Sequence, residues 1–193
     1  MQHNLEHFVR YFMPNISDYS LNLFSSITIH KHFSKGKVII KQGQVPTNFY
    51  ILTNGVARSF IKNNNNREHT RTIYTAMSTC GALSSLISES KSNATYECLT
   101  DCDCLMVNFK KLVKITKSNH EMSLLYSKVM EKIFIRTEER VDELALLNAT
   151  ERYLKLKKDI PEIDNLIPQY HIASFLNVTP VQLSRIRKKL YSV

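Results

Sequence analysis

The sequence predicts an α+β protein in which a strand-rich first part is followed by a long helix and a small helical C-terminal part. Short apolar or alternating runs, separated by turn residues, extend from Ile29 to about Asn108. Over residues 118–148, apolar residues recur at steps of three and four, and residues 169–190 have the pattern of two short helices joined by a tight turn. Because many short strands with tight turns favour a sandwich or barrel, we expect an antiparallel β-roll in the first part.

We expect a first domain over residues 1–115, a long helix with its linker over residues 116–148, and a C-terminal helical domain over residues 149–193. Residues 1 to about 28 are predicted to be helical, with one apolar face formed by Leu5, Phe8, Val9 and Phe12. The clearest strand patterns lie at residues 37–40, 49–52, 56–60 and 104–107. Asn63 to Asn66 predict a hairpin tip, because asparagine tolerates left-handed backbone. A low-complexity binding segment is the alternative.

The sequence contains four cysteines, Cys80, Cys98, Cys102 and Cys104. In a cytosolic chain of this size they are not expected to form a disulfide framework. The last three share parity, so on extended backbone they point to one face, where cysteine behaves as a small apolar residue. They lack the C-x-x-C spacing or nearby histidine that a metal or iron–sulfur site needs. We predict that they are buried in the core, with a redox role as the alternative.

The long predicted helix has two apolar stripes. One is a coiled-coil-like seam with steps of four and three, formed by Met130, Phe134, Thr137, Val141, Leu144 and Asn148. The other, Leu125, Val129 and Ile133, is expected to face the strand-rich domain. Because a helix with two apolar stripes usually bridges two bodies, we predict a homodimer along the seam. Packing on its own domain alone is the alternative. A further helix is expected to begin near Glu151 and to end near Ile160, before a proline.

Residues Gln169 to Leu190, QYHIASFLNVTPVQLSRIRKKL, predict a helix-turn-helix. Ala173 is small where the two helices approach, and Asn177 tolerates the positive φ that the turn needs. Thr179, Pro180 and Gln182 supply an N-cap, a first-turn proline and a capping box. The residues expected to face the shared core are Ile172, Leu176, Val178, Leu183 and Ile186.

The second of these helices presents a basic face. Leu183, Ile186 and Leu190 share one side, which leaves Gln182, Arg185 and Lys189 on another. From Thr179 onward there are four basic residues and no acidic residue. Basic side chains on a protruding helix neutralise phosphates, and Arg or Gln near its start can reach base edges. The pattern favours DNA binding over a surface helix whose charges only aid solubility.

Composition agrees with an anionic partner. The 193 residues are 43% hydrophobic, enough for real cores, and the formal net charge is +9. Such a charge favours a polyanion without distinguishing nucleic acid from a membrane surface. No apolar run approaches membrane-spanning length and the N-terminus lacks a signal-peptide core, so we expect a cytoplasmic protein with no membrane partner.

The order of these parts resembles the CRP/FNR family of bacterial transcription regulators, and the likeness covers nearly the whole chain. In the first domain its motifs are FSKG at residues 33–36, KQGQ at 41–44, FYILTNG at 49–55, and Gly81. The resemblance implies a cyclic-nucleotide-binding-like sensor domain with a double-stranded β-helix or jelly-roll, and a homodimer on a near-palindromic double-stranded DNA operator. It also implies RNA polymerase as a further partner. The family's wing hairpin would begin about where the sequence ends, so a full wing is not expected.

The effector cassette departs from the family pattern. Cyclic-nucleotide-binding members have Gly-Glu-Leu and, after a short helix, Arg-Ser-Ala, where the glutamate holds the ribose and the arginine the cyclic phosphate. Here Ala82 replaces the glutamate and Ser92 stands where the arginine is expected. Without a guanidinium fork there is no bidentate grip on phosphate, so we expect no tight cyclic-AMP binding and no cofactor. The effector is unidentified, and the pocket implied by the resemblance comprises Gly81, Ala82, Leu83, Ser92 and Asn93.

The resemblance also assigns roles in DNA binding. Gln169 and Thr179 match phosphate-contacting positions, and the pair Ser184-Arg185 matches the base-reading surface. Arg185 is the candidate for a bidentate guanine contact; an ion pair with the long helix or a non-specific phosphate contact are the alternatives. Val181 stands where the family often has glutamate, and it can only contact a thymine methyl group. The full expected set is Gln169, Thr179, Val181, Gln182, Ser184, Arg185, Lys188 and Lys189.

Enzyme chemistry has little support in the sequence. His3 and His7 lie four apart without forming a zinc-protease motif, and His30 and His32 are expected to be a surface pair on one strand. No phosphate-cradling glycine loop or nucleophile elbow is visible, so we expect no catalytic and no metal site. The competing interpretation is a ligand-sensing module that acts through protein partners without specific DNA binding.

Overall fold

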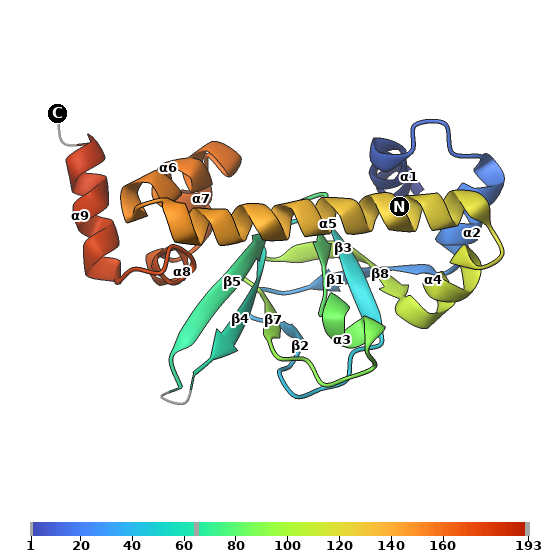
Figure 1. The fold of residues 1–193 in the computed structure, drawn as a ribbon, viewed down its shortest axis with the longest axis horizontal. Helices are drawn as coiled ribbons and strands as arrows, with labels where there is room; N and C mark the ends of the chain where they lie inside the picture. The colour runs from blue at the N-terminus through green and yellow to red at the C-terminus, as the bar shows by residue number, and fades with distance from the viewer. Residues whose placement is uncertain (1, 64–65, 192–193) are drawn as a thin grey trace.

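The computed structural model describes residues 2–63 and 66–191, which form nine helices and eight strands (Figure 1). The helices are α1 (Gln2–Phe12), α2 (Asp18–Ser26), α3 (Leu83–Ile87), α4 (Phe109–Thr116), α5 (His120–Leu146), α6 (Ala149–Asp159), α7 (Ile163–Leu166), α8 (Gln169–Phe175) and α9 (Pro180–Tyr191). The strands are β1 (Thr28–Phe33), β2 (Val38–Ile40), β3 (Asn48–Asn54), β4 (Ala57–Lys62), β5 (Glu68–Tyr74), β6 (Thr79–Cys80), β7 (Thr95–Cys98) and β8 (Cys102–Asn108). Within the described part of the chain, no helix is both long and apolar enough to cross a membrane.

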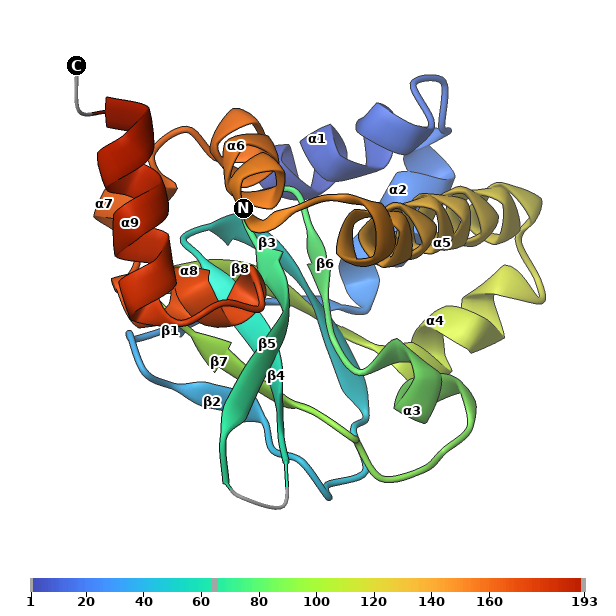
Figure 2. The same ribbon diagram turned by 60° about the vertical axis from the view of Figure 1, so that its left-hand side comes forward.

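The strands form two antiparallel sheets, ordered β1-β8-β3-β6 and β2-β7-β4-β5. Residues from both sheets share one interior cluster that includes Ile40, Tyr50 and Leu52. The hairpin of β4 and β5 lies at the edge of the second sheet, with β5 next to α8 (Figure 2). Asn63 N–H donates to the carbonyl of Arg67 at 3.1 Å, which continues the hairpin pairing past β4; the two central asparagines of the predicted tip lie outside the described residues. This architecture confirms the predicted β-roll with a long helix and a small helical part after it.

The four cysteines meet inside the roll, each with an exposed fraction of at most 1%. Cys98 ends β7 and Cys102 begins β8, strands of different sheets, so the thiols converge because the sheets face each other. Burial raises the pKa of the Cys104 thiol to about 12 and that of Cys80 well above its ordinary value. The predicted core location is confirmed.

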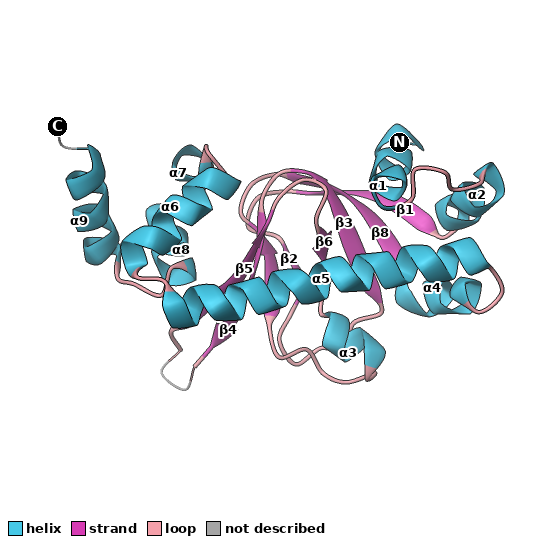
Figure 3. Cartoon of the chain, turned by 45° about the horizontal axis from the view of Figure 1, so that its top comes forward, coloured by secondary structure: helices cyan, strands magenta, loops and turns pink. Residues whose placement is uncertain are grey.

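The N-terminal segment is two helices and not one continuous helix. The chain leaves α1 after Phe12, and Ser17 caps α2 by accepting a hydrogen bond from Ser20 N–H at 3.2 Å. Phe8 and Val9 are buried in a cluster that also contains residues of α5 and β8. Both helices therefore cover one end of the roll, beside the start of α5 (Figure 3).

The long helix α5 lies along the roll (Figures 1 and 3). Leu125 and Val129 are buried and Ile133 packs at the edge of the same cluster, so the stripe predicted to face the strand-rich domain does so. On the predicted seam, Phe134 and Val141 are 64% and 58% exposed. Thr137 and Leu144 are also exposed, which leaves an apolar stripe on this chain open to solvent.

Two residues of the predicted seam have other positions. Met130 is half-buried and packs on its own chain's core. Asn148 lies beyond the end of α5 and caps α6: it accepts a hydrogen bond from Glu151 N–H, while the Glu151 carboxylate accepts from Asn148 N–H at 2.7 Å. The assignment of Asn148 to the seam was wrong because a reciprocal capping box ends one helix and begins the next.

The C-terminal helices share a core with the β-roll. Val56, Ile73 and Leu99 of the roll region join one cluster with residues of α6 to α9. The helical members of that cluster are Tyr153, Leu156, Ile163, Ile167, Ile172, Ala173, Leu176 and Leu183. The Tyr153 hydroxyl donates to Asp164 at 2.7 Å, which satisfies its polar atom inside this core. The segment predicted to be a helix-turn-helix is therefore packed against the roll (Figure 2).

Gly55, between β3 and β4, is required by a close approach. Its φ is +89°, and a Cβ atom there would lie 2.2 Å from the Asp101 carbonyl oxygen and 2.9 Å from the Cys102 sulfur. Gly36 has a similar φ of +80°, but a Cβ atom there would have no neighbour within 4 Å. Comparing substitutions at the two glycines therefore separates the destabilisation caused by backbone conformation from that caused by steric overlap.

Gly55→Ala is expected to lower the free energy of unfolding by about 3 kcal/mol, since both the backbone strain and the overlap apply. Gly36→Ala has the strain alone and should cost about 1 kcal/mol. Urea denaturation of both variants measures the difference. Equal losses would contradict the close approach at Gly55.

Candidate nucleic-acid interface

The turn between α8 and α9 has the geometry that the sequence predicts. Asn177 has a φ of +55°, the left-handed conformation expected at this point. Val178 N–H donates to the Ala173 carbonyl at 3.0 Å, which closes the turn. Ile172, Ala173, Leu176 and Leu183 are fully buried, and Val178 and Ile186 pack at the edge of their cluster. The buried positions and the left-handed turn predicted for these two helices are therefore present.

The start of α9 is held by the predicted capping box. Gln182 N–H donates to the Thr179 hydroxyl at 3.2 Å, and Thr179 N–H donates to Oε1 of Gln182 at 2.8 Å. Gln182 is exposed, and these bonds use the oxygen of its side-chain amide. Gln169, the first residue of α8, is half-buried. The cap thus fixes the direction in which the second helix leaves the turn.

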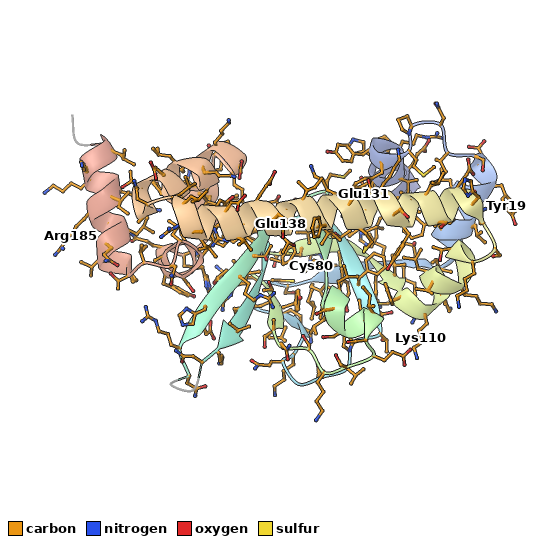
Figure 4. All side chains as sticks on the ribbon, in the orientation of Figure 1. Tyr19, Cys80, Lys110, Glu131, Glu138 and Arg185 are labelled. Carbon is orange, nitrogen blue, oxygen red and sulfur yellow. The ribbon has the colours of Figure 1, made fainter. Side chains whose placement is uncertain are left out.

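The outer face of α9 is exposed and basic. Val181 is 61% exposed, and Ser184, Arg185, Lys188 and Lys189 are also exposed. Arg185 extends away from the body of the protein (Figure 4). Among the described residues, none forms an ion pair with Arg185, Lys188 or Lys189. The alternative in which Arg185 pairs with the long helix is therefore not the arrangement of this chain.

Arg187, the fourth basic residue of this segment, points inward. Its guanidinium forms an ion pair with Asp164 and lies 5.7 Å from the centre of the Tyr153 ring. Three of the four cations counted in the sequence therefore remain on the open face. Helical spacing places Arg187 next to Leu183 and Leu190, which both pack in the inner cluster, and the count of charges took no account of this spacing.

Helix α8 is bound to the edge of the roll by side chains that the sequence did not single out. The Ser174 hydroxyl accepts a hydrogen bond from Thr70 N–H at 2.9 Å and donates to the Glu68 carbonyl at 3.1 Å. Arg140 of α5 donates to the Phe175 carbonyl, and its guanidinium lies 3.9 Å from the centre of the Phe175 ring. These contacts fix the helix-turn-helix to both β5 and α5, because they bind α8 on two sides.

A buried polar cluster lies beneath this contact. Arg58 is 3% exposed and donates to the carboxylates of Glu97, at 2.8 and 3.0 Å, and of Glu68 at 2.6 Å. His171 of α8 is 5% exposed, and its Nδ1 has no hydrogen-bond partner in the described structure. Burial, together with the charge of Arg58, lowers the pKa of His171 to about 4. The imidazole is therefore neutral in the folded protein at neutral pH.

The effector residues implied by the resemblance do not line one cavity. Ala82 is buried in the interior cluster of the roll. Ser92 is buried with its hydroxyl donating to the Ala94 carbonyl at 2.7 Å, whereas Asn93 is exposed. Gly81 and Leu83 alone of the five line a cavity of about 1350 Å³ between the roll and α5. That cavity is bordered by aromatic side chains including Tyr74 and Tyr96.

Metal ligands are not gathered in the described residues: no group of three or more His, Cys, Asp or Glu side chains is placed to hold a metal ion. His32 instead forms an exposed pair with Asp103, with 2.8 Å between Nδ1 and the carboxylate. That contact raises the pKa of His32. His30 and His32 are both exposed on β1, as expected for a surface pair.

The roll is similar in sequence to a known family of domains. Residues 30–119 match the family model of the cyclic nucleotide-binding domain. No curated protein matches the sequence of this chain.

Solved structures match almost the whole chain in fold. One is the c-di-GMP-responsive global regulator CLP of Xanthomonas campestris, with 13% identity over 91% of this chain and 92% of that chain and a TM-score of 0.70. FixK2 of Bradyrhizobium japonicum has 16% identity over 86% and 85%, with a TM-score of 0.70. A protein from Eubacterium rectale assigned to the CRP/FNR family of transcriptional regulators has 18% identity over 93% and 87%, and again a TM-score of 0.70. At these identities the likeness is one of fold.

The depressed pKa of His171 predicts a loss of stability in mild acid. The unfolded chain binds a proton near the ordinary pKa of 6.5, whereas the folded chain does so only near 4, so stability is complete above about pH 6.5 and falls as the pH drops toward 4. The expected loss from this group reaches about 3 kcal/mol. Denaturation of the wild type and of His171→Asn at pH 7 and pH 5 measures it. The same pH dependence in both proteins would contradict the role of His171.

Proposed function

We propose that this protein is a DNA-binding transcription regulator that acts as a homodimer, with α9 in the major groove. The observation that supports this most is the open basic face of a capped second helix in a helix-turn-helix. Arg185, Lys188 and Lys189 lie on that face without acidic partners among the described residues. Cations left unpaired on a protruding helix are suited to phosphates, because their binding releases counterions. The fold likeness to regulators of the CRP/FNR family points the same way.

The start of α9 is the part that reads bases in this proposal. In a helix-turn-helix, the N-terminal residues of the second helix contact base edges. Arg185 is exposed there and is suited to a bidentate contact with guanine, whereas Val181, 61% exposed, can contact only a thymine methyl group. Gln169 and Thr179 are assigned to phosphates, and Gln182 and Ser184 to the groove. Arg187 has no such role, because Asp164 holds it inside.

Dimerisation in this proposal uses the exposed stripe of α5. Phe134 and Val141 are large apolar side chains more than half exposed on one face of that helix. A second copy of the chain can cover both through the same face, since a two-fold axis pairs identical surfaces. Two recognition helices related in this way require half-sites about one helical turn apart on a near-palindromic operator. RNA polymerase is the expected further partner on that DNA.

Cyclic AMP is not the effector in this proposal. The position of the family's glutamate is occupied by Ala82, which is buried among apolar side chains. The position of its arginine is occupied by Ser92, whose hydroxyl is bound to the Ala94 carbonyl. Neither residue offers charge to a cyclic phosphate. The cavity beside α5 is the space for a different small molecule.

In vitro selection of bound DNA tests the function. We expect a near-palindrome with a guanine in each half-site, and the same sequence and affinity with or without cyclic AMP.

Arg185→Ala should cost about 1–3 kcal/mol of binding free energy on this site and relax one base position per half-site. Lys37→Ala, which removes one exposed charge from the turn before β2, is the matched control. Absence of any selected sequence, with partner binding retained after removal of residues 165–193, would instead support a sensing module that acts through proteins.

The dimer has its own test. Phe134→Glu introduces a charge into the proposed interface, so light scattering should show a monomer and operator affinity should fall at least tenfold. Ile135→Glu is the control, because Ile135 is 53% exposed on the same helix and lies off the seam. Loss of the dimer in both variants, or in neither, would exclude the seam as the interface.

A further inference from the structure

The β4–β5 hairpin of the roll lies beside the helix-turn-helix. A groove of about 180 Å³ separates the two, and its lining includes Arg67 and His69 of the hairpin and Tyr170 and Pro180 of the helix-turn-helix. Pro180 is the first residue of α9. Because the start of a recognition helix is the end that enters the major groove, side chains beside Pro180 lie next to the phosphates that border that groove.

Two cationic side chains of the hairpin, Arg67 and Arg71, form no ion pair among the described residues, and Arg67 is the one that borders the groove. Glu68 is the acidic residue of the hairpin, and it is bound by Arg58 at 2.6 Å and by Lys62 at 3.4 Å. Arg67 is exposed, and no ion pair joins its guanidinium to another described residue. Two hairpin arginines border the groove at the start of α9: Arg58 is bound by carboxylates, whereas Arg67 is available to an external anion.

The hairpin is also fixed relative to α9. Asn63 N–H donates to the Arg67 carbonyl at 3.1 Å, and Arg67 N–H donates to the Asn63 side chain at 3.0 Å, which holds the Arg67 backbone. Further along the chain, Thr70 N–H and the Glu68 carbonyl bind the Ser174 hydroxyl of α8. The Arg67 backbone therefore keeps its position beside the recognition helix, so DNA binding there requires little further ordering of the main chain.

We propose that the β4–β5 hairpin is a second DNA-contacting element, in which Arg67 binds a backbone phosphate next to the base pairs that α9 reads. The inference rests on the proposed function and extends the DNA-binding surface from the helix-turn-helix to the β-roll. A phosphate contact adds affinity without sequence preference, in contrast to the base contact assigned to Arg185. It also couples the roll to DNA, because β5, which begins directly after Arg67, borders the cavity beside α5.

Fluorescence anisotropy over a range of salt concentrations tests this with the full-length protein and both the selected operator and a scrambled duplex. Arg67→Ala should weaken binding about threefold to tenfold on both duplexes. It should also reduce the slope of log affinity against log salt by about 0.9 for each phosphate that is no longer neutralised. Arg67→Glu should weaken binding further, whereas Lys37→Ala and Lys37→Glu should have little effect. Urea denaturation checks that each variant is folded.

Ser174→Ala supplies an independent measurement. Removing the hydroxyl releases the hairpin from α8, so the Ser174→Ala and Arg67→Ala effects on affinity should be less than additive in a double-mutant cycle. Unchanged affinity and salt slope for Arg67→Ala in a protein that still selects its operator would overturn this inference and leave the proposed function standing. A loss confined to the operator would overturn the phosphate assignment. Failure of the wild type to bind any duplex would overturn both proposals.

Discussion

The apolar cluster shared by the β-roll and the C-terminal helices is the constraint on which the rest of the structure depends. Tyr153, Ile163, Ile172, Leu176 and Leu183 are all fully buried in it, and each such side chain stabilises the fold by roughly 1.5–3 kcal/mol. The roll contributes Val56, Ile73 and Leu99 to the same cluster. Because neither part can bury these surfaces alone, the C-terminal helices take their orientation from the β-roll.

Polar contacts around this core determine how the β-roll and the C-terminal helices are oriented relative to each other. Apolar packing is non-directional, whereas the two hydrogen bonds of Ser174 specify which strand edge meets α8. Below them, the guanidinium of Arg58 is bound by two carboxylates, which offsets the free-energy cost of burying its charge. Arg140 spans from α5 to the same helix. A change at the cavity beside α5 therefore has a short physical route, through β5 and α5, to the helix proposed to bind DNA.

Local rules in the sequence predicted the elements that depend on neighbours in the chain. The left-handed Asn177, the capping box of Thr179 and Gln182, and the buried stripe of Leu125 and Val129 all follow from spacing and intrinsic preference. One group of predictions that failed concerns helix boundaries. Asn148 belongs to the cap of α6, and the N-terminal helix is broken near Pro14, because capping side chains compete with continuation of a helix.

The β-roll, the long helix and the small helical part after it could be predicted from the sequence, because each depends on residues close together in the chain. The other features of the structure depend on how segments that are distant in the chain pack together. This packing places the Arg187 guanidinium against Asp164 and brings the thiols of two facing sheets together. It also places the β4–β5 hairpin beside Pro180. Spacing along the chain specifies which side of a helix a residue occupies. The surface that this side meets depends instead on contacts between segments about a hundred residues apart, such as Thr70 and Ser174.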